Sequence, residues 1–310
     1  MTDVVGRVLD VSVASATIER RDGSVVTVNL ADVVAAKSVP ATPTRSRGAM
    51  AISADNLTRI TSRGWPAVVS QELGEWELRA AGGFTGRANS VAVTGSPGIP
   101  AAEAIADVIA FYEAHGLGPM AQVVVGSPGE RLFLDAGWAP WADRVAGSGA
   151  IVQVATLRDQ LGTASFALDG VTVEDHASDE WLALYHRVED QKTARAVLEA
   201  PATVAFLSIA YPVINGPVVA IGRVVVTGEW AGLAGVEVAA DRRRQGLARR
   251  IVEASIEWAR QHGADKAYLQ TKTDNTAAIA LYAPYGFRTH HEYAYLVPPD
   301  PHSERTADSK

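Results

Sequence analysis

The chain has 310 residues, enough for two or three domains, and its 47% hydrophobic and 20% charged residues are typical of a globular protein. It contains no cysteine, which excludes disulfide bonds, cysteine-ligated metals and cysteine nucleophiles. The formal net charge of −7 disfavours direct binding to nucleic acid but leaves room for a basic partner such as a lysine-bearing tail or a polyamine. No apolar run approaches twenty residues and no signal-peptide pattern follows Met1, so we expect a cytoplasmic protein without membrane contact, monomeric or homodimeric.

Residues 1–45 have the pattern of a small β module. Alternating apolar residues predict three strands: Arg7–Val13, Ala16–Arg20 and Val25–Asn29. The pair Asp22-Gly23 suits the hairpin turn between the last two. Leu30–Lys37 is predicted to form a helical turn or a last strand, so the module favours an SH3-like barrel. The mixed polar residues Pro40–Met50 are expected to form a linker.

Residues 46–160, which we name the first unit, alternate between predicted strands and helices. The elements are strands at Glu75–Ala80, Ser90–Val93 and Gln122–Val125 and helices at Ala101–His115 and Glu130–Ala136. The segment Trp76–Ser90 carries Arg79, Arg87 and Asn89, side chains that suit a polar ligand. The alternative interpretation is a hairpin whose turns these same side chains stabilise.

Residues 161–298, the second unit, begin with a predicted strand at Gly170–Asp175. Two helices follow at Ser178–Asp190 and Thr193–Glu199, and then three strands: Val204–Ile209, Val218–Val226 and Leu233–Val238. A helix from Gly246 to His262 is next, and Gly263 is a typical stop signal for it. The polar residues 299–310 are expected to form a disordered tail.

The junction between the strand Leu233–Val238 and the helix after Gly246 has the features of an anion-binding loop. The first turn of a helix presents free backbone N–H groups and the positive end of the dipole, and glycine lets a phosphate approach the main chain. Arg243, Arg244 and Arg249 add positive charge suited to a diphosphate. Alanine at Gly246 should therefore weaken anion binding while stabilising the helix through its higher propensity.

The residues Arg243-x-x-Gly246-x-Ala248 resemble the acetyl-CoA signature [QR]-x-x-G-x-[GA] of the GCN5-related N-acetyltransferases (GNAT superfamily). A predicted strand at Ala267–Thr271 follows. The segment Asn275–Phe287 then matches the closing pattern of the same superfamily, N-x-x-A-x-x-L-Y-x-x-x-G-F, at every fixed position. The two motifs occur in the order and at the separation that this fold requires. Pro284 is expected to distort or end the helix that carries the second motif.

The order of elements in the first unit is similar to that in the second, which indicates an internal repeat. Gly95–Pro100 stands where the phosphate loop belongs, and its prolines remove N–H donors. Phe133 stands at the position of Tyr282, so the first unit is expected to be a degenerate copy that contributes acceptor surface. The predicted fold is α/β (α+β): tandem GNAT folds with a mixed central sheet and flanking helices, preceded by a small SH3-like β-barrel. The arrangement resembles an actinobacterial GNAT family, some of whose members are described as protein (histone-type) acetyltransferases.

The resemblance implies an acetyl-CoA-dependent N-acetyltransferase that acts on a primary amine by direct attack in a ternary complex. The acceptor is either a protein lysine, including lysines of the histone type, or a small-molecule amine. The alternative is a catalytically inactive sensor that binds acetyl-CoA or another acyl-CoA. The implied cofactor-binding residues are Val236, Val238, Arg243, Arg244, Gln245, Gly246, Leu247, Ala248, Arg249 and Asn275. Because the thioester carbonyl needs free N–H groups, the strand around Val236 is expected to splay from the strand Ala267–Thr271.

Tyr282 matches the general acid of the superfamily, since a neutral phenol can protonate a leaving thiolate. Its alternative role is core packing. The general base is less determined: Glu237 is the first candidate, Glu229 the second, and a chain of waters the third. In a regular strand the side chain of Glu237 should point away from those of its two neighbours.

No metal site is predicted. His186 and Asp190 would share one face of a predicted helix, but no third ligand is evident, so a solvated pair is the better interpretation. His290 and His291 are neighbours in the predicted last strand and should point to opposite faces of the sheet.

Overall fold

The computed structural model describes residues 4, 6–20, 25–33, 48–141, 149–157, 168, 170–186, 188, 190–211 and 216–299. The chain forms two compact bodies, Met1–Ser46 and Arg47–Lys310. The predicted Asp22-Gly23 turn, most of the linker before Met50 and the tail from Asp300 lie outside the described residues. Within the described part, no helix is both long enough and apolar enough to cross a bilayer.

The first body contains a three-stranded antiparallel sheet in the order β1-β2-β3. Its strands are β1 (Gly6–Val11), β2 (Ser15–Arg20) and β3 (Val25–Asn29), close to the predicted positions. The described part of the next segment is a short 3-10 turn, η1 (Leu30–Asp32), because the side chain of Asn29 accepts a hydrogen bond from the Ala31 N–H at 3.1 Å. The SH3-like barrel stays a prediction.

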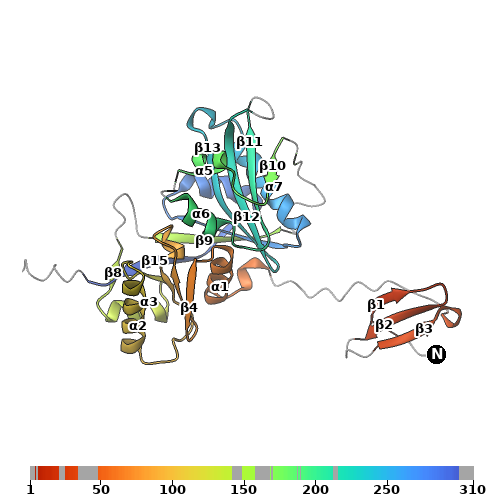
Figure 1. The fold of residues 1–310 in the computed structure, drawn as a ribbon, viewed down its shortest axis with the longest axis horizontal. Helices are drawn as coiled ribbons and strands as arrows, with labels where there is room; N and C mark the ends of the chain where they lie inside the picture. The colour runs from red at the N-terminus through yellow and green to blue at the C-terminus, as the bar shows by residue number, and fades with distance from the viewer. Residues whose placement is uncertain are drawn as a thin grey trace, which may run out of the picture. The chain divides into compact units, whose positions relative to one another are not determined.

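One twelve-stranded mixed sheet forms the centre of the second body, in the order β10-β11-β12-β13-β14-β9-β15-β7-β6-β5-β4, with β8 paired to β15 (Figure 1). Its strands are β4 (Val69–Leu73), β5 (Trp76–Ala80), β6 (Val91–Ala92), β7 (Ala121–Val124), β8 (Ala139–Pro140), β9 (Gly149–Thr156), β10 (Thr172–Glu174), β11 (Val204–Ala210), β12 (Val218–Thr227), β13 (Trp230–Val238), β14 (Lys266–Lys272) and β15 (Arg288–Val297). Its helices are α1 (Ala54–Gly64), α2 (Ala101–Ala114), α3 (Pro128–Asp135), α5 (Asp179–Tyr185), α6 (Gln191–Leu198), α7 (Leu247–Gln261) and α8 (Thr276–Tyr282). Short 3-10 turns are η2 (Ala49–Ala51), η3 (Gly86–Ala88), η4 (Ala240–Arg242) and η5 (Ala283–Tyr285).

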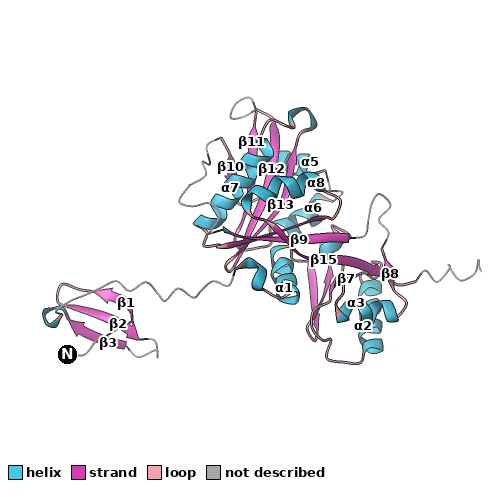
Figure 2. Ribbon diagram, turned by 180° about the vertical axis from the view of Figure 1, so that it is seen from behind, coloured by secondary structure: helices cyan, strands magenta, loops and turns pink. Residues whose placement is uncertain are grey.

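The first and second units exchange their last strands. β9, from the first unit, pairs antiparallel with β14 of the second unit, whereas β15, from the second unit, pairs with β7 of the first. β9 and β15 also pair with each other, and they lie between the two halves of the sheet (Figures 1 and 2). Each half of the sheet is therefore completed by a strand from the other unit, which explains why residues from Arg47 onward form one compact body.

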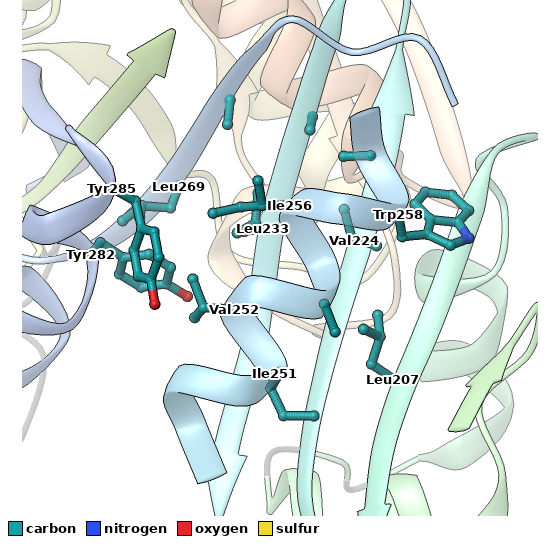
Figure 3. Close-up of a cluster of buried hydrophobic side chains, with 14 of the residues drawn as sticks. Leu207, Val224, Leu233, Ile251, Val252, Ile256, Trp258, Leu269, Tyr282 and Tyr285 are labelled. Carbon is teal, nitrogen blue, oxygen red and sulfur yellow. The ribbon is translucent and has the colours of Figure 1, made fainter. Parts of the chain in front are cut away.

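Helix α7 buries its apolar stripe against the sheet, as its sequence predicts. Ile251, Val252 and Ile256 are fully buried, and they belong to one cluster with Leu207 and other strand residues (Figure 3). Burying each of these side chains contributes about 1.5–3 kcal/mol relative to leaving it exposed. The cluster fixes the position of the helix, and with it the loop that precedes the helix.

One prediction about local structure needs correction, and one helix was missed. The predicted helix Ser178–Asp190 is too long, because α5 ends at Tyr185 and His186 takes a left-handed φ of +50°. Asp190 instead caps α6, accepting hydrogen bonds from the N–H groups of Lys192 and Thr193. Helix α1 was not expected at all, since Thr and Ser residues occupy most of its buried positions.

Candidate active site

A cavity of about 1140 Å³ lies between the second unit and the loop of the first unit that contains Arg87. Part of its lining comes from β13, the loop before α7, the start of α7, β14 and α8. The lining also includes Thr85, Gly86, Arg87, Trp141, Tyr293 and Tyr295. Both units therefore contribute to the same space.

The cavity opens where β13 and β14 separate. Their parallel pairing runs from Trp230 opposite Lys266 to Leu233 opposite Leu269, although both strands continue for several residues beyond. On its other edge β13 has a bulge, because its register with β12 shifts between Ile221 and Arg223 and Gly235 takes a φ of +64°. The predicted splay is confirmed. Within the described strands, the edge of β13 after Leu233 is left without a pairing strand on the β14 side.

The loop before α7 presents a helix N-terminus to the cavity. Gly246 is the N-cap with a left-handed φ of +81°, and no side chain caps this end of the helix. No atom lies within 4 Å of the place where a Cβ of residue 246 would stand. The expectation that alanine would stabilise the helix here is wrong, because a left-handed φ costs a residue with a Cβ about 1–2 kcal/mol. The backbone conformation at residue 246 therefore favours glycine.

Cationic side chains surround this helix N-terminus. Arg243, Arg244 and Arg249 line the cavity, as does Arg242, which sequence reasoning missed. The Arg243 guanidinium donates to the carbonyl oxygen of Val238 at 3.3 Å, which ties the loop to the end of β13. The charge of these residues adds to the helix dipole, so this end of the cavity suits an anion.

Tyr282 stands at the C-terminal end of α8, lines the cavity and is only 6% exposed. Its ring packs edge-on against Phe287 with centroids 5.3 Å apart, and Figure 3 shows it beside Tyr285 and facing Val252 of α7. Burial, and then the charge of Glu237, raise the pKa of the Tyr282 phenol well above its usual value. Its hydroxyl has no hydrogen-bond partner among the described residues, so the proton is available to the cavity.

Pro284 does not displace this phenol. Helix α8 ends at Tyr282, and Pro284 lies in the separate turn η5 that follows, as its sequence predicts. Tyr285, in contrast, donates its hydroxyl to Glu253 at 2.8 Å, so its role is to join η5 to α7. Of these two tyrosines, Tyr282 is the one that lines the cavity.

The structure separates the two candidate bases. Glu237 lines the cavity together with both of its neighbours in β13, and its charge acts on Tyr282. Glu229 is outside the lining; it sits in the turn before β13 and pairs with the buried Lys266 at 2.5 Å. Of these two carboxylates, Glu237 is the one near the phenol.

All but one of the remaining predicted cofactor-binding residues line the cavity. Val236, Val238, Leu247, Ala248 and Asn275 line the cavity, whereas Gln245 does not. Asn275 also caps α8, because its Oδ1 accepts a hydrogen bond from the Ala278 N–H at 3.1 Å. Gln245 is exposed.

The histidine predictions are partly wrong. His186 and Asp190 do not share a helix, because α5 ends before His186. His290 and His291 do not point apart: a bulge in β15 brings their Nδ1 atoms to 2.8 Å. Burial, and then His290, lower the pKa of His291 to about 4, so it is neutral at neutral pH. Among the described residues, no group of three or more His, Asp or Glu side chains could hold a metal.

The polar side chains of the segment Trp76–Ser90 lie in two different environments. Arg79 is 2% exposed and donates to Ser62, Ser90 and Gln122, and Asn89 bonds the backbone of its own loop, so both are structural. Arg87 instead lines the cavity. Several of its neighbours there were not predicted, namely Trp141, Gln270, Lys272, Tyr293 and Tyr295. They belong to no local motif and reach the cavity through the exchanged strands and the ends of β8 and β14.

Comparisons with known proteins agree with this geometry. The family described as "Probable histone acetyltransferase Rv0428c C-terminal" matches residues 52–296. The "Probable histone acetyltransferase Rv0428c" of Mycobacterium tuberculosis is 28% identical over 309 residues, which cover 96% of this chain and 89% of that protein. The "Uncharacterized N-acetyltransferase YobR" of Bacillus subtilis is 26% identical over 249 residues, covering 78% of this chain and 97% of that protein.

A solved structure shows the same fold. The GCN5-related N-acetyltransferase from Kribbella flavida superposes with a TM-score of 0.58 at 18% identity, covering 81% of this chain and 98% of that one. At this level of identity the likeness concerns the fold.

Proposed function

Since the chain belongs to the Rv0428c C-terminal acetyltransferase family, and with it to the GCN5-related N-acetyltransferases, we propose that it transfers the acetyl group of acetyl-CoA to a primary amine. Transfer occurs by direct attack with both substrates bound. The observation that carries this proposal is that one cavity joins the anion-binding loop, the splayed strands and the phenol of Tyr282. A continuous space of about 1140 Å³ has room for a cofactor arm and an acceptor together.

The residues present fit acetyl-CoA. The helix N-terminus at Gly246 and the arginines around it suit the diphosphate, and the open edge of β13 after Leu233 suits an extended arm that pairs like a strand. The lining here is cationic and Gly246 has no Cβ, which favours close approach of a phosphate. Sequence matches at Gly246, Asn275 and Tyr282 therefore converge on one place.

The chain's own groups divide the chemistry between them. Acetyl-CoA supplies the acetyl group and a thiolate leaving group. The unpaired edge of β13 offers N–H donors to the thioester carbonyl oxygen, which gains negative charge as the amine nitrogen attacks the carbonyl carbon. The C–N bond forms, the C–S bond breaks, and the Tyr282 hydroxyl gives its proton to the departing sulfur. Glu237, or water beside it, removes the proton that the attacking nitrogen loses.

Calorimetric titration of the full chain with acetyl-CoA tests the first half of this proposal. A dissociation constant weaker than about 1 mM, equivalent to about −4 kcal/mol, would contradict it. Release of free thiol from acetyl-CoA in the presence of a panel of amines tests the second half. A protein that binds acetyl-CoA tightly and releases no thiol with any amine would instead be a sensor.

A further inference from the structure

The part of the cavity lining that surrounds Arg87 is aromatic and cationic. Six cationic side chains line the whole cavity, and Glu237 is the one carboxylate in the described lining: the cations are Arg87, Arg242, Arg243, Arg244, Arg249 and Lys272. Five of these belong to the second unit, but Arg87 comes from the first unit. Gly86, which precedes Arg87, packs on Tyr295, and the Tyr295 ring contacts the rings of Trp141 and Tyr293. A site for a polycation, such as a lysine-rich tail, would be expected to carry several carboxylates here.

Arg87 is held in a fixed orientation. Its guanidinium lies over the Trp65 ring, 3.9 Å from the ring centroid, and its Nη1 donates to the Gln270 Oε1 at 2.8 Å. Its Nε and Nη2 have no partner among the residues that the structure describes, and Arg87 forms no ion pair there with a carboxylate. A positioned guanidinium with two free donors is suited to a planar oxyanion such as a carboxylate, or to a phosphate.

The loop that carries Arg87 is strained. Thr85 takes a left-handed φ of +61°, which is rare for a β-branched residue. Surrounding contacts enforce this conformation: the Trp65 Nε1 donates to the Thr85 hydroxyl at 2.9 Å, and the Ser90 hydroxyl donates to the Gly86 carbonyl oxygen at 2.7 Å. Gly86 packs so closely on Tyr295 that a Cβ would meet the ring at 3.0–3.3 Å. Strain of this kind persists where the surrounding structure requires it, and it is concentrated at binding sites.

From these observations we infer that the acceptor is an amine whose molecule also carries an anionic group, a carboxylate or a phosphate, and that Arg87 binds this group. The inference rests on the proposed acetyl transfer. Aromatic rings by themselves would also suit a cation, but the Arg87 guanidinium already occupies the face of Trp65 and would repel a second positive charge nearby. Trp141, Tyr293 and Tyr295 then pack against the apolar body of the acceptor.

Pairs of amines that differ only in the anionic group test this assignment by thiol release. The pairs are L-phenylalanine with phenethylamine, 6-aminohexanoate with pentylamine, and O-phosphoethanolamine with ethanolamine; spermidine and a lysine-rich peptide serve as the cationic arm. We expect the anionic member of at least one pair to have a kcat/KM about tenfold higher than its partner, the usual effect of a charged hydrogen bond. The carboxylate and phosphate pairs distinguish the two anions.

Variants of Arg87 test whether this residue causes the preference for amines that carry an anionic group. Arg87→Gln should raise the KM for the amine with the anionic group about tenfold and leave unchanged the KM of the partner that lacks this group. Arg87→Lys should recover part of the loss, and Arg87→Glu should favour spermidine. Arg131→Gln removes the same charge from an exposed position on α3 outside the cavity lining and should change neither KM. The affinity of each Arg87 variant for acetyl-CoA should match that of the unaltered protein, which shows that the second unit is intact.

Two results would overturn the inference. One is faster turnover of spermidine or the lysine-rich peptide than of every anionic amine, insensitive to Arg87→Gln. The other is equal turnover within every pair; if no amine turns over, equal binding of the paired N-acetylated products in the presence of CoA has the same meaning. An unaltered protein that fails to bind acetyl-CoA contradicts the proposed function instead, so the two failures are distinguishable.

Discussion

Two strand-to-helix junctions in this protein have the same topology and opposite electrostatics. In the first unit β6 leads into α2, and in the second unit β13 leads into α7; each strand pairs in parallel with the strand that follows its helix. At the first junction, two N–H groups of the loop before α2 are bonded to carboxylates. Ser96 N donates to the Glu75 Oε2 at 2.8 Å, and Gly95 N donates to the Asp55 Oδ2 at 3.1 Å.

Neither α2 nor α7 has a side-chain cap, but the second junction faces a cavity lined by arginines. The strands also differ: β6 stays bonded to β7 beyond its end, through the Val93 N–H to Gln122 carbonyl bond at 3.1 Å, whereas β13 separates from β14 after Leu233. Topology therefore does not make an anion site. The site requires N–H groups that the chain leaves open and a charge that attracts the ligand.

The largest expected effect comes from giving the second unit the phenylalanine that the first unit has at the corresponding position. Tyr282 packs edge-on against Phe287 at 5.3 Å, and Phe133 packs edge-on against Trp138 at 4.8 Å, with the same spacing in sequence. Tyr282→Phe keeps this packing and removes only the hydroxyl. We expect kcat to fall about 10²-fold, the usual contribution of one proton-transfer group, with unchanged affinity for acetyl-CoA. Steady-state thiol release measures the rate, and an unaltered kcat would remove Tyr282 from the mechanism.

The next largest effect is expected at Gly246, the N-cap of α7 at the second junction. Gly246→Ala should weaken acetyl-CoA binding at least about tenfold, because the new Cβ enters the space of the diphosphate. It should also lower the free energy of unfolding by about 1–2 kcal/mol, because residue 246 has a left-handed φ. Calorimetric titration and chemical denaturation measure the two effects.

The other end of α7 provides a matched control for this variant. Gly263 has a φ of +89° and, like Gly246, no atom within 4 Å of a Cβ placed there. It is outside the cavity lining. Gly263→Ala should therefore cost similar stability without affecting acetyl-CoA binding. If both variants bind acetyl-CoA normally, the loop is only the start of a helix.

A smaller effect is expected from the arginines that distinguish the second junction. Arg244 lines the cavity and is exposed, so Arg244→Ala should weaken acetyl-CoA binding severalfold at low salt, and less as the Debye length falls to about 3 Å at 1 M salt. Arg250→Ala, in the first turn of α7 and outside the lining, is the control for net charge. Equal losses in the two variants, at every salt concentration, would mean that the effect is a general one of charge and not of contact.

The two junctions also show what sequence reasoning can find. Gly246, Asn275 and Tyr282 were identifiable because each lies in a motif whose spacing is local to one helix. Arg87 was included in a polar segment, but the sequence could not distinguish its position in the cavity from the structural role of Arg79, because that difference depends on packing. Tyr293 and Tyr295 gave no signal, because they reach the cavity through a strand that pairs with the other unit, and long-range pairing leaves no local pattern.

The smallest expected effect comes from replacing the carboxylate of Glu75 at the first junction. Glu75 accepts from Ser96 N and from Arg59 at 2.9 Å, but its side chain is 56% exposed, so Glu75→Gln should lower the free energy of unfolding by less than about 1 kcal/mol. It should not create a second acetyl-CoA site, even when combined with Asp55→Asn. The loop would still contain Pro97 and Pro100, which lack N–H donors, and β6 would still be paired with β7. Calorimetry should therefore give one acetyl-CoA per chain for the unaltered protein and for both variants. A second binding event in the double variant would show that the two carboxylates alone keep the first unit from binding the cofactor.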